Sequence, residues 1–289
     1  MYKNYLIFNS RSGRARKRNM KASDLIKMLH WHGLANVELV EEGMSSIVPH
    51  IDPDSMLIIA GGDGTLLEAM QVPGILEMPI AIIPLGTLNN LAWSAHIPFN
   101  LDDACEVAAN GRIRRIDLGR AGNMVFTQAA GAGFDARAFH VYGTSREKSL
   151  FKAVRAFTAA LATWEPQMMR VEIDGEETIH EAVQVTAANT PVYGADLKIA
   201  PDAVIDDGEL DVGIIIGCKP RAGTIKCLLG FMEGKTLDPS NILRVRARRV
   251  GIYPATDAMI PVHADAAPIG YCPVTIEVMP SCLRLMVPS

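Results

Sequence analysis

A run of three glycines, an aspartate and a threonine occupies residues 61–65, directly after the apolar residues 56–60. Glycines leave the backbone N–H groups uncovered, so an anion can approach them closely. The hydroxyl of Thr65 would add a donor near the start of a helix, where the helix dipole favours phosphate. Asp63 is an acidic residue in an anion site, and a bridging Mg²⁺ would reconcile the two. In a simpler interpretation, the segment is a tight turn in which Asp63 caps the helix.

The first apolar run of the chain is also followed by small polar residues. Residues 9–13 read Asn-Ser-Arg-Ser-Gly and come directly after the apolar residues 5–8. At the end of a strand, such residues can contact phosphate. The basic residues in and after this segment are Arg11, Arg14, Arg16, Lys17, Arg18 and Lys21. They form either a solvated face at the start of a helix or a surface for a phosphate-rich ligand or an anionic membrane.

A third polar loop, residues 84–92, follows the apolar residues 80–83. Thr87 can cap a helix here, a role that needs no ligand. Asn89 and Asn90 are harder to explain, because asparagine is a poor helix former. Their side chains could instead orient a phosphate, a metal-bound water or a substrate hydroxyl.

The apolar runs before these three loops are short, continuous and bounded by glycine or polar turns, which is typical of buried parallel strands. Helical patterns at residues 20–32 and after the glycine run separate them. Alternation of strands and helices predicts a doubly wound α/β layer. Ligands bind such sheets at the carboxyl ends of the strands, where all three loops are expected.

The second half of the chain is expected to be rich in β-structure. The sequence predicts a hairpin at 113–135, strands at 171–176, 183–187, 210–216, 245–253, 274–279 and 283–287, and helices at 150–164 and 220–232. The pair Asp174-Gly175 favours a hairpin turn. The change in character predicts two domains, residues 1–120 and 121–289, in keeping with about 150 residues per domain.

The composition is that of an ordinary globular protein, with 289 residues of which 49% are hydrophobic and 21% charged. A formal net charge of −4 argues against a nucleic-acid partner, since a general nucleic-acid binder would be basic.

The five cysteines show no Cys-x-x-Cys spacing, which favours a reducing compartment over disulfides or zinc. We find no signal-peptide pattern and no uninterrupted apolar stretch of about 20 residues. We therefore expect a cytoplasmic location, with room for peripheral contact at the inner membrane face.

The three loops in this order resemble the motifs of the diacylglycerol kinase-like lipid kinases, a family that also includes the sphingosine kinases. The resemblance continues through residues 191–194, 200–203, 206–212 and 276–288, so it covers nearly the whole chain. It implies a Rossmann-like nucleotide domain and a C-terminal β-sandwich domain, that is, an α/β fold followed by an all-β fold. It also implies ATP-dependent phosphorylation of a lipid hydroxyl in the cleft between these domains.

The resemblance also implies roles for individual residues. The residues expected at the nucleotide are Asn9, Ser12, Gly13, Gly61, Gly62, Asp63, Gly64, Thr65, Glu68, Thr87 and Asn89. Asp63 is expected to act in catalysis as well. Asp207 would hold a structural Mg²⁺, helped by carbonyls or waters near Val204 and Glu209. Without the resemblance, residues 206–208 are simply a hairpin turn.

The chain departs from the family pattern at two places. Ser10 replaces a proline of the first motif, a change we expect to be tolerated. Near the C-terminus the family shows Asp-Gly-Glu, and its glutamate is the proposed general base; here Asp265 is followed by Ala266 and Ala267. An alanine cannot accept a proton, so Asp265 or His263 would have to serve, although both are equally explained as a turn residue and a surface imidazole. A general base typically contributes 10²- to 10⁴-fold, and phosphoryl transfer relies mainly on positioning.

Three functions therefore remain in competition. The first is a kinase that uses ATP and Mg²⁺ to phosphorylate a lipid alcohol such as diacylglycerol, phosphatidylglycerol, a sphingoid base or a polyprenol. An NAD kinase shares the Gly-Gly-Asp-Gly-Thr string but not the Asn89-Asn90 motif or the Asp207-Gly208 segment. Ala267 suggests a third function, that of a pseudokinase that binds nucleotide or lipid without turnover.

The arginines at 244, 246, 248 and 249 suggest membrane contact or a solvated edge strand, and an exposed edge would allow a homodimer.

Overall fold

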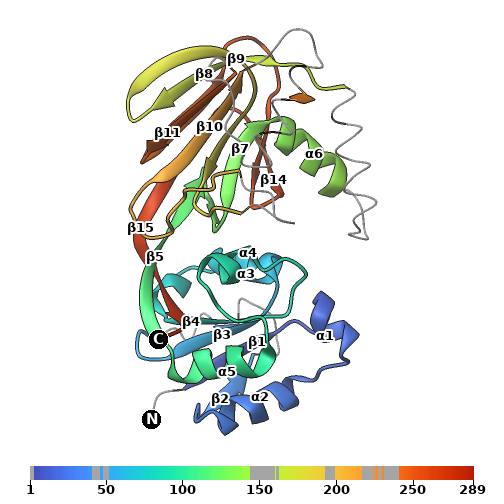
Figure 1. The fold of residues 1–289 in the computed structure, drawn as a ribbon, viewed down its shortest axis with the longest axis vertical. Coiled ribbons are helices and arrows are strands. Elements are labelled where there is room, and N and C mark those ends of the chain that lie inside the picture. Colours follow the sequence, from blue (N-terminus) through green and yellow to red (C-terminus); the bar gives the residue numbers. More distant parts are fainter. Residues whose placement is uncertain are drawn as a thin grey trace. The chain divides into compact units, whose positions relative to one another are not determined.

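The computed structural model describes residues 3–40, 46–47, 52–143, 160, 163–192, 199–216, 223, 225–226, 230 and 241–289. The predicted helices at 150–164 and 220–232 lie almost entirely outside the described residues. The chain forms two compact units (Figure 1). Unit 1 contains Met1–Asp117 and Pro280–Ser289, and unit 2 contains Leu118–Met279.

Unit 1 is built on a parallel sheet whose strand order is β2-β1-β3-β4-β15. Its strands are β1 (Asn4–Phe8), β2 (Val37–Leu39), β3 (Met56–Gly61), β4 (Ile80–Pro84) and the end of β15 (Val274–Val287). Every residue of β3 and β4 is buried, as the continuous apolar runs predict for strands covered on both faces. The predicted doubly wound α/β layer is thus confirmed.

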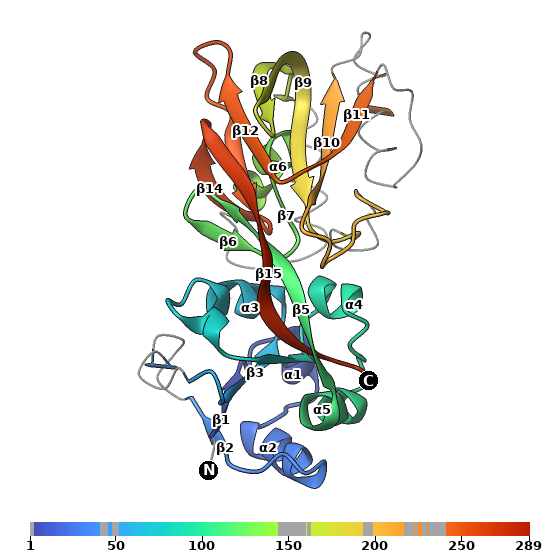
Figure 2. The same ribbon diagram turned by 90° about the vertical axis from the view of Figure 1, so that its left-hand side faces the viewer.

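Helices cover both faces of this sheet. They are α1 (Gly13–Lys17), α2 (Ala22–Trp31), α3 (Asp63–Met70), α4 (Asn90–Ser94) and α5 (Leu101–Asn110), with a short 3₁₀ turn, η2, at Ile75–Glu77. Figures 1 and 2 show α3 and α4 on one face of the sheet and α2 and α5 on the other. Leu25 and Leu29 of α2 lie in one buried cluster with Cys105 of α5, which fixes the two helices on their shared face.

Two strands contain residues of both units. These are β5 (Arg112–Ala121) and β15, which pair with each other. The sequence predicts two separate strands at 274–279 and 283–287, but β15 runs through Pro280 as a single strand. Leu285 of this strand pairs in parallel with Ile80 of β4, so residues 280–289 belong to unit 1 and not to the β-rich unit predicted to begin at residue 121.

Unit 2 is antiparallel. Beside the shared strands it contains β6 (Met124–Phe126), β7 (Ala129–Gly133), β8 (Gln167–Ile173), β9 (Glu176–Ala188), β10 (Leu210–Ile216), β11 (Ile242–Ala247), β12 (Arg249–Pro254), β13 (Pro261–Ala264) and β14 (Ala267–Tyr271). The long strand β9 pairs with β8 through its first half and with both β7 and β10 through its second half. Because its two halves pair with different strands, β9 links the layers that enclose the apolar core. This pairing fits the predicted β-sandwich (Figure 2).

Two elements of unit 2 differ from the prediction. The segment 113–135 contains β5, β6 and β7 instead of one hairpin, and it leads into a helix that the sequence did not predict, α6 (Phe134–Gly143). The predicted strand at 245–253 is two strands, β11 and β12. The hairpin turn between β8 and β9 is confirmed, with positive φ angles of 47° at Asp174 and 94° at Gly175.

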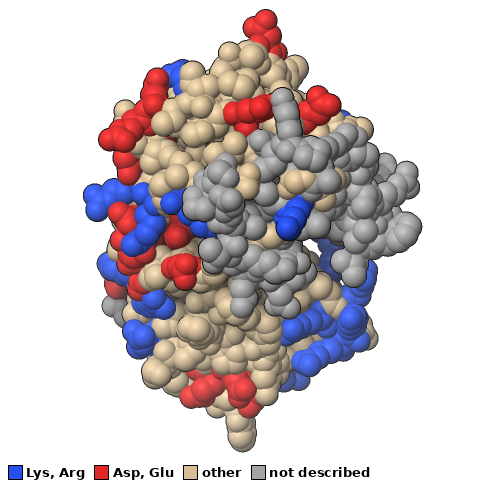
Figure 3. Space-filling view, turned by 45° about the horizontal axis from the view of Figure 1, so that its top comes forward, with Lys and Arg blue, Asp and Glu red and all other residues tan. Residues whose placement is uncertain are grey.

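Most of the exposed residues around α1 are basic. Arg11, Arg16, Lys17, Arg18 and Lys21 are exposed, and Figure 3 shows that Lys and Arg side chains gather on this side of the molecule. Arg14 differs from them, because its guanidinium stacks over the Phe99 ring and donates a hydrogen bond to the Phe99 carbonyl at 3.1 Å. The predicted basic face is thus exposed apart from this one anchored arginine.

Candidate functional site

The loops after β1 and β3 meet at the point where the strand order of the unit 1 sheet reverses. From β1 the chain passes to β2 on one side and then to β3 on the other, which makes this edge the expected ligand site of a doubly wound sheet. Asn9 Nδ2 donates to Thr65 Oγ1 at 2.8 Å and joins the two loops. Ser12 Oγ donates to the Asn9 carbonyl at 2.5 Å, so the first loop is closed on itself.

The loop after β4 lies against the loop after β3 through two glycines. A Cβ atom on Gly86 would lie 2.5 Å from Gly62 Cα, and one on Gly62 would lie 2.8 Å from Gly86 Cα. Neither position can hold a side chain without moving backbone. A Cβ on Gly13 would come within 3.0 Å of Thr87 Oγ1, so the first loop is close to the third as well. The three predicted motifs are therefore brought together in unit 1.

Gly64 differs from these glycines. A Cβ atom at this position would meet no heavy atom within 4 Å, and the residue is exposed in the first turn of α3. Packing within the described residues therefore does not require a glycine here. The open space lies beside the N-terminus of α3, where a phosphate group is favoured.

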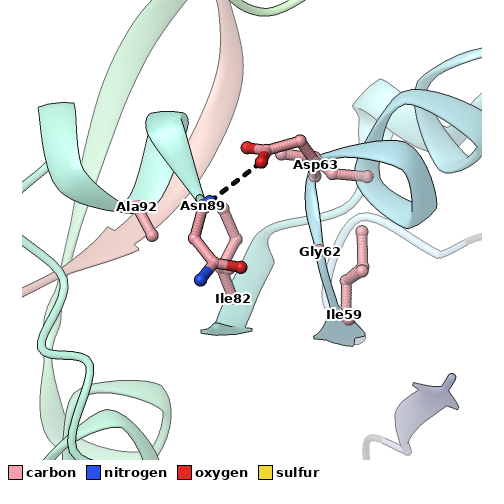
Figure 4. A pocket seen from close by; sticks show the side chains of 8 residues that line it. Ile59, Gly62, Asp63, Ile82, Asn89 and Ala92 are labelled. Carbon is pink, nitrogen blue, oxygen red and sulfur yellow. Dashed lines mark hydrogen bonds between the residues drawn. The ribbon is translucent and has the colours of Figure 1, made fainter. Parts of the chain in front are cut away.

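Asp63 caps a neighbouring helix instead of its own. Its carboxylate accepts the backbone N–H groups of Asn89, at 2.8 Å, and Asn90, at 2.7 Å, and Asn90 is the first residue of α4 (Figure 4). Burial raises the pKa of Asp63, and these backbone hydrogen bonds oppose that rise. Asp63 thus ties the start of α3 to the start of α4.

The two asparagines of the third motif are buried parts of this connection. Asn89 adopts a left-handed backbone conformation, with φ 57° and ψ 53°, which asparagine tolerates better than most residues. Its side-chain amide accepts from Gly86 N at 2.8 Å and donates to Gly86 O at 3.0 Å. This use of the Asn89 side chain is structural, whereas the family resemblance implies a contact to nucleotide.

A small cavity lies beneath these residues, between β3, β4, α3 and α4 (Figure 4). Its lining consists of Ile59, Gly61, Gly62, Asp63, Leu66, Ile82, Asn89 and Ala92. Its volume of about 10 Å³ has room for roughly one water molecule and not for a nucleotide. Of the residues predicted to contact nucleotide, Gly64 and Glu68 of α3 and Thr87 of the third loop are exposed.

Asp265 of unit 2 is completely surrounded by hydrogen-bond donors. One oxygen accepts from the backbone N–H of Thr127, at 2.7 Å, and from its hydroxyl, at 2.8 Å; the other accepts from the N–H groups of Gln128, at 2.8 Å, and Ala129, at 3.1 Å. A carboxylate has about four lone-pair positions, and all are used here. Burial raises the pKa of Asp265, and the hydrogen bonds to residues 127–129 oppose that rise. This arrangement holds the 127–129 loop and leaves no lone pair for a substrate proton.

The turn after β13 places an alanine in a strained conformation. Asp265 and Ala266 form the two-residue turn between β13 and β14, with φ angles of 44° and 63°. Such turns favour glycine at the second position, and the family pattern has glycine there. We expect Ala266→Gly to raise the free energy of unfolding by about 1 kcal/mol because the Cβ strain of the left-handed region is removed. Urea unfolding of the two proteins tests this, and a destabilised Ala266→Gly protein would contradict it.

His263 and Ala267 lie on opposite faces of the β13–β14 hairpin. Ala267 pairs with Ala264, whose side chain belongs to the core of the sandwich, and successive residues of a strand alternate in direction. His263 is fully buried on the other face, where its ring contacts Phe139 of α6 edge-on at 4.9 Å. His263 therefore does not replace a glutamate at position 267, and it is not the surface imidazole of the alternative interpretation.

A buried polar network that the sequence analysis missed surrounds His263. Asp135 Oδ2 lies 2.9 Å from His263 Nε2 and accepts the hydroxyl of Thr186 at 3.0 Å, and Gln184 Nε2 donates to Thr186 Oγ1 at 2.9 Å. Asp135 follows Gly131 and Gly133 closely, and this spacing of glycines before an acidic residue was the available signal. Within the hairpin predicted at 113–135, however, glycines are equally typical of turns.

The predicted magnesium ligands are engaged by an arginine. The guanidinium of Arg246 pairs with the carboxylate of Asp207 and lies 3.0 Å from Glu209 Oε2. Asp207 Oδ1 also accepts Glu209 N at 3.1 Å, while Val204 is exposed. Within the described ranges, no group of three or more His, Cys, Asp or Glu side chains is arranged to hold a metal. The residues present here therefore do not fit the implied structural Mg²⁺.

Models of two known families match nearly the whole chain. Residues 3–121 match the diacylglycerol kinase catalytic domain, and residues 128–287 match the YegS C-terminal NAD kinase beta sandwich-like domain. The chain belongs to the diacylglycerol kinase-like lipid kinases. It is thus a phosphotransferase of the lipid kinase class, and "NAD kinase" in the second description names only the fold of its C-terminal domain.

Individual relatives of this lipid kinase agree with the family models. A probable lipid kinase, YegS-like, from Pseudomonas putida is 28% identical over 265 residues, which cover 90% of this chain and 84% of the relative. A diacylglycerol kinase from Staphylococcus carnosus is 27% identical over 282 residues, covering 93% and 89%. The crystal structure of a putative diacylglycerol kinase from Bacillus anthracis shares the fold, with a TM-score of 0.75, 19% identity and coverage of 99% and 96%. None of the helices in the described part of the lipid kinase has the length and apolar character needed to cross a bilayer.

Proposed function

We propose that this lipid kinase transfers the γ-phosphoryl group of ATP to the hydroxyl of a lipid alcohol. The observation that carries the proposal is the convergence of three loops in unit 1, together with the exposed Gly64 in the first turn of α3. Two of the loops are locked by Asn9 and Thr65, and the third is held by Asp63 and Gly86. The open space beside Gly64 then allows a phosphate to approach the backbone N–H groups at the start of α3.

In this proposal the loops bind and orient the phosphates. Gly62, Gly64 and Thr65 present backbone and hydroxyl donors, and the exposed Thr87 and Glu68 border the ligand. A Mg²⁺ bound with the nucleotide would neutralise phosphate charge as the bond to the leaving oxygen breaks. Asp63 fixes the start of α4 relative to the start of α3. Its contribution is therefore to keep the backbone and hydroxyl donors directed at the same phosphate position. Such positioning is the main requirement of phosphoryl transfer.

Proton removal from the lipid hydroxyl is the weak step of the proposed reaction. Ala267 carries no proton acceptor, Asp265 has its lone pairs filled, and His263 lies on the other face of the hairpin. The transfer would therefore depend on positioning and on water as the proton acceptor. Because a general base typically contributes 10²- to 10⁴-fold, we expect slow turnover and not its absence.

The decisive experiment follows labelled γ-phosphate from ATP, with Mg²⁺, to a panel of lipid alcohols and to NAD. Wild type is compared with Ala267→Glu, whose new side chain starts from a half-buried position at the beginning of β14. We expect labelled lipid from wild type and a rate at least about 10-fold higher from Ala267→Glu. Ala267→Gln is the matched control, since it has the same size without a proton acceptor.

Two other outcomes would replace the proposal. Labelled NADP instead of lipid would make the protein an NAD kinase. Nucleotide binding without lipid labelling by wild type would favour a pseudokinase, a candidate that rests on Ala267 and the saturated Asp265.

We further propose that the protein is cytoplasmic and reaches its lipid by peripheral contact, for which the exposed basic residues around α1 are suited. A homodimer through a sheet edge remains a proposal that sedimentation of the full chain tests.

A further inference from the structure

The segment expected to hold a metal lies beside two arginines in unit 2. Strands β10 and β11 pair antiparallel, with Asp211 directly opposite Arg246. Arg244 and Arg246 are two residues apart on β11, so both side chains project from the same face. The turn that leads into β10 carries Asp207 and Glu209. Acidic and basic residues of this region thus come from two elements that only the strand pairing brings together.

Arg246 is the cationic partner of this turn. Its guanidinium contacts the carboxylates of Asp207 and Glu209, and its Cα partner across the strands is Asp211. The guanidinium of Arg244 has a different partner: it donates to the carbonyl of Ile199 at 2.7 Å. Among the described residues, three carboxylates therefore share the neighbourhood of one guanidinium.

The charge balance shows what this guanidinium does. The carboxylates of Asp207, Glu209 and Asp211 outnumber the guanidinium groups of Arg244 and Arg246 in this region. Negative charge is thus already in excess, and the arginines oppose it. Without Arg246, three carboxylates would repel one another at the entry to β10.

We infer that Arg246 takes the place of a divalent cation in this turn, so that residues 204–211 keep their conformation without bound metal. A guanidinium is planar, always charged, and able to donate to two carboxylates at once, which is the task a bridging cation would perform. A divalent ion would be repelled by the guanidinium and would have to displace it from both carboxylates. The inference concerns the stability of unit 2 and goes beyond the proposed kinase reaction.

Thermal unfolding of the full chain without nucleotide tests the inference. Wild type is compared in EDTA and in excess Mg²⁺, and we expect its Tm to be the same in both. Arg246→Met keeps most of the side-chain length and removes the charge. Because Arg246 is about half exposed, with 51% of its side chain accessible, we expect a Tm lower by roughly 2–4 °C in EDTA. Part of this loss should return in Mg²⁺, since the carboxylates are then available to the ion.

The matched control is Arg248→Met. Arg248 is exposed two residues further along; its backbone N–H donates to Asp174 and its carbonyl accepts from Val278 N at 2.9 Å. This variant should unfold at the wild-type temperature with or without Mg²⁺. A wild-type Tm that rises in Mg²⁺ and falls in EDTA would overturn the inference, and that measurement needs no variant to fold. Equal Tm values for Arg246→Met and Arg248→Met would overturn it as well.

Discussion

Replacing Asp63 by alanine is expected to abolish phosphoryl transfer and to destabilise unit 1. The carboxylate of Asp63 is the acceptor for the N–H groups of Asn89 and Asn90, at 2.8 and 2.7 Å. Hydrogen bonds to a charged group contribute about 1.5–3 kcal/mol each. With both lost, we expect unfolding to become easier by about 3 kcal/mol and the transfer rate to fall at least about 100-fold.

Asp63→Asn separates the two roles of this residue. The asparagine oxygen can still accept one of the N–H groups, so the variant should recover part of the stability but none of the negative charge. The test measures nucleotide binding, phosphoryl transfer and urea unfolding for Asp63→Ala, Asp63→Asn and Glu68→Gln. Glu68 is exposed one turn further along α3, so Glu68→Gln serves as the stability control. Full activity in Asp63→Ala would show that the phosphates bind elsewhere.

Replacing Asp265 by alanine is expected to have the largest effect on stability. Four hydrogen bonds from residues 127–129 converge on this buried carboxylate, and without it three backbone N–H groups are left without their acceptor. Removing one partner of a buried charged network typically costs 3–5 kcal/mol. We therefore expect a loss of at least about 3 kcal/mol. The measurement is the urea midpoint of the full chain followed by tryptophan fluorescence.

Asp265→Asn and Ala266→Gly complete this experiment. Asparagine offers one acceptor oxygen, so Asp265→Asn should fall between wild type and Asp265→Ala. Ala266→Gly changes the same turn without touching the hydrogen bonds, and its expected effect has the opposite sign. If Asp265→Ala were as stable as wild type, the carboxylate would not hold the loop, and a direct role in the reaction would again be open to it.

The sequence was sufficient for the strands and loops of unit 1 because their signals are local. Residues 56–60 and 80–83 are apolar throughout, and this pattern is typical of a strand covered on both faces. The glycines that follow mark the ends of these strands. Continuous apolar runs and turn residues are read within a few positions of one another, so no distant contact is needed to interpret them.

The partners of the key polar residues could not be predicted, since they depend on pairing between distant segments. Asp63 finds its donors 26 and 27 residues away, Asp265 finds its donors more than 130 residues away, and Arg246 meets Asp207 across 39 residues. The residue types alone show only that carboxylates lie at these positions of the sequence. Whether each carboxylate serves a ligand or the fold is decided only by the register of the strands and helices.

The missed helix α6 has a similar explanation. Gly131 and Gly133 are typical turn residues within the hairpin predicted at 113–135, whereas β7 ends at Gly133 and α6 begins at Phe134. In the structure a Cβ on Gly131 would lie 2.5 Å from the carbonyl oxygen of Val185, and one on Gly133 would lie 2.6 Å from that of Val183. These glycines permit close approach of β7 to β9 instead of a turn, and only the neighbouring strand reveals the difference.

The strand β15 has a consequence for how the protein is made. Residues 280–289 belong to unit 1, and β15 pairs with β4 through Leu285. On the ribosome, residues 3–117 emerge early, yet the sheet that carries the three loops must wait for β15. Until then β4, an entirely apolar strand, is an open edge able to join another chain. Unit 1 therefore completes its sheet only after unit 2 has been synthesised, and the nascent chain must keep that edge covered in the meantime.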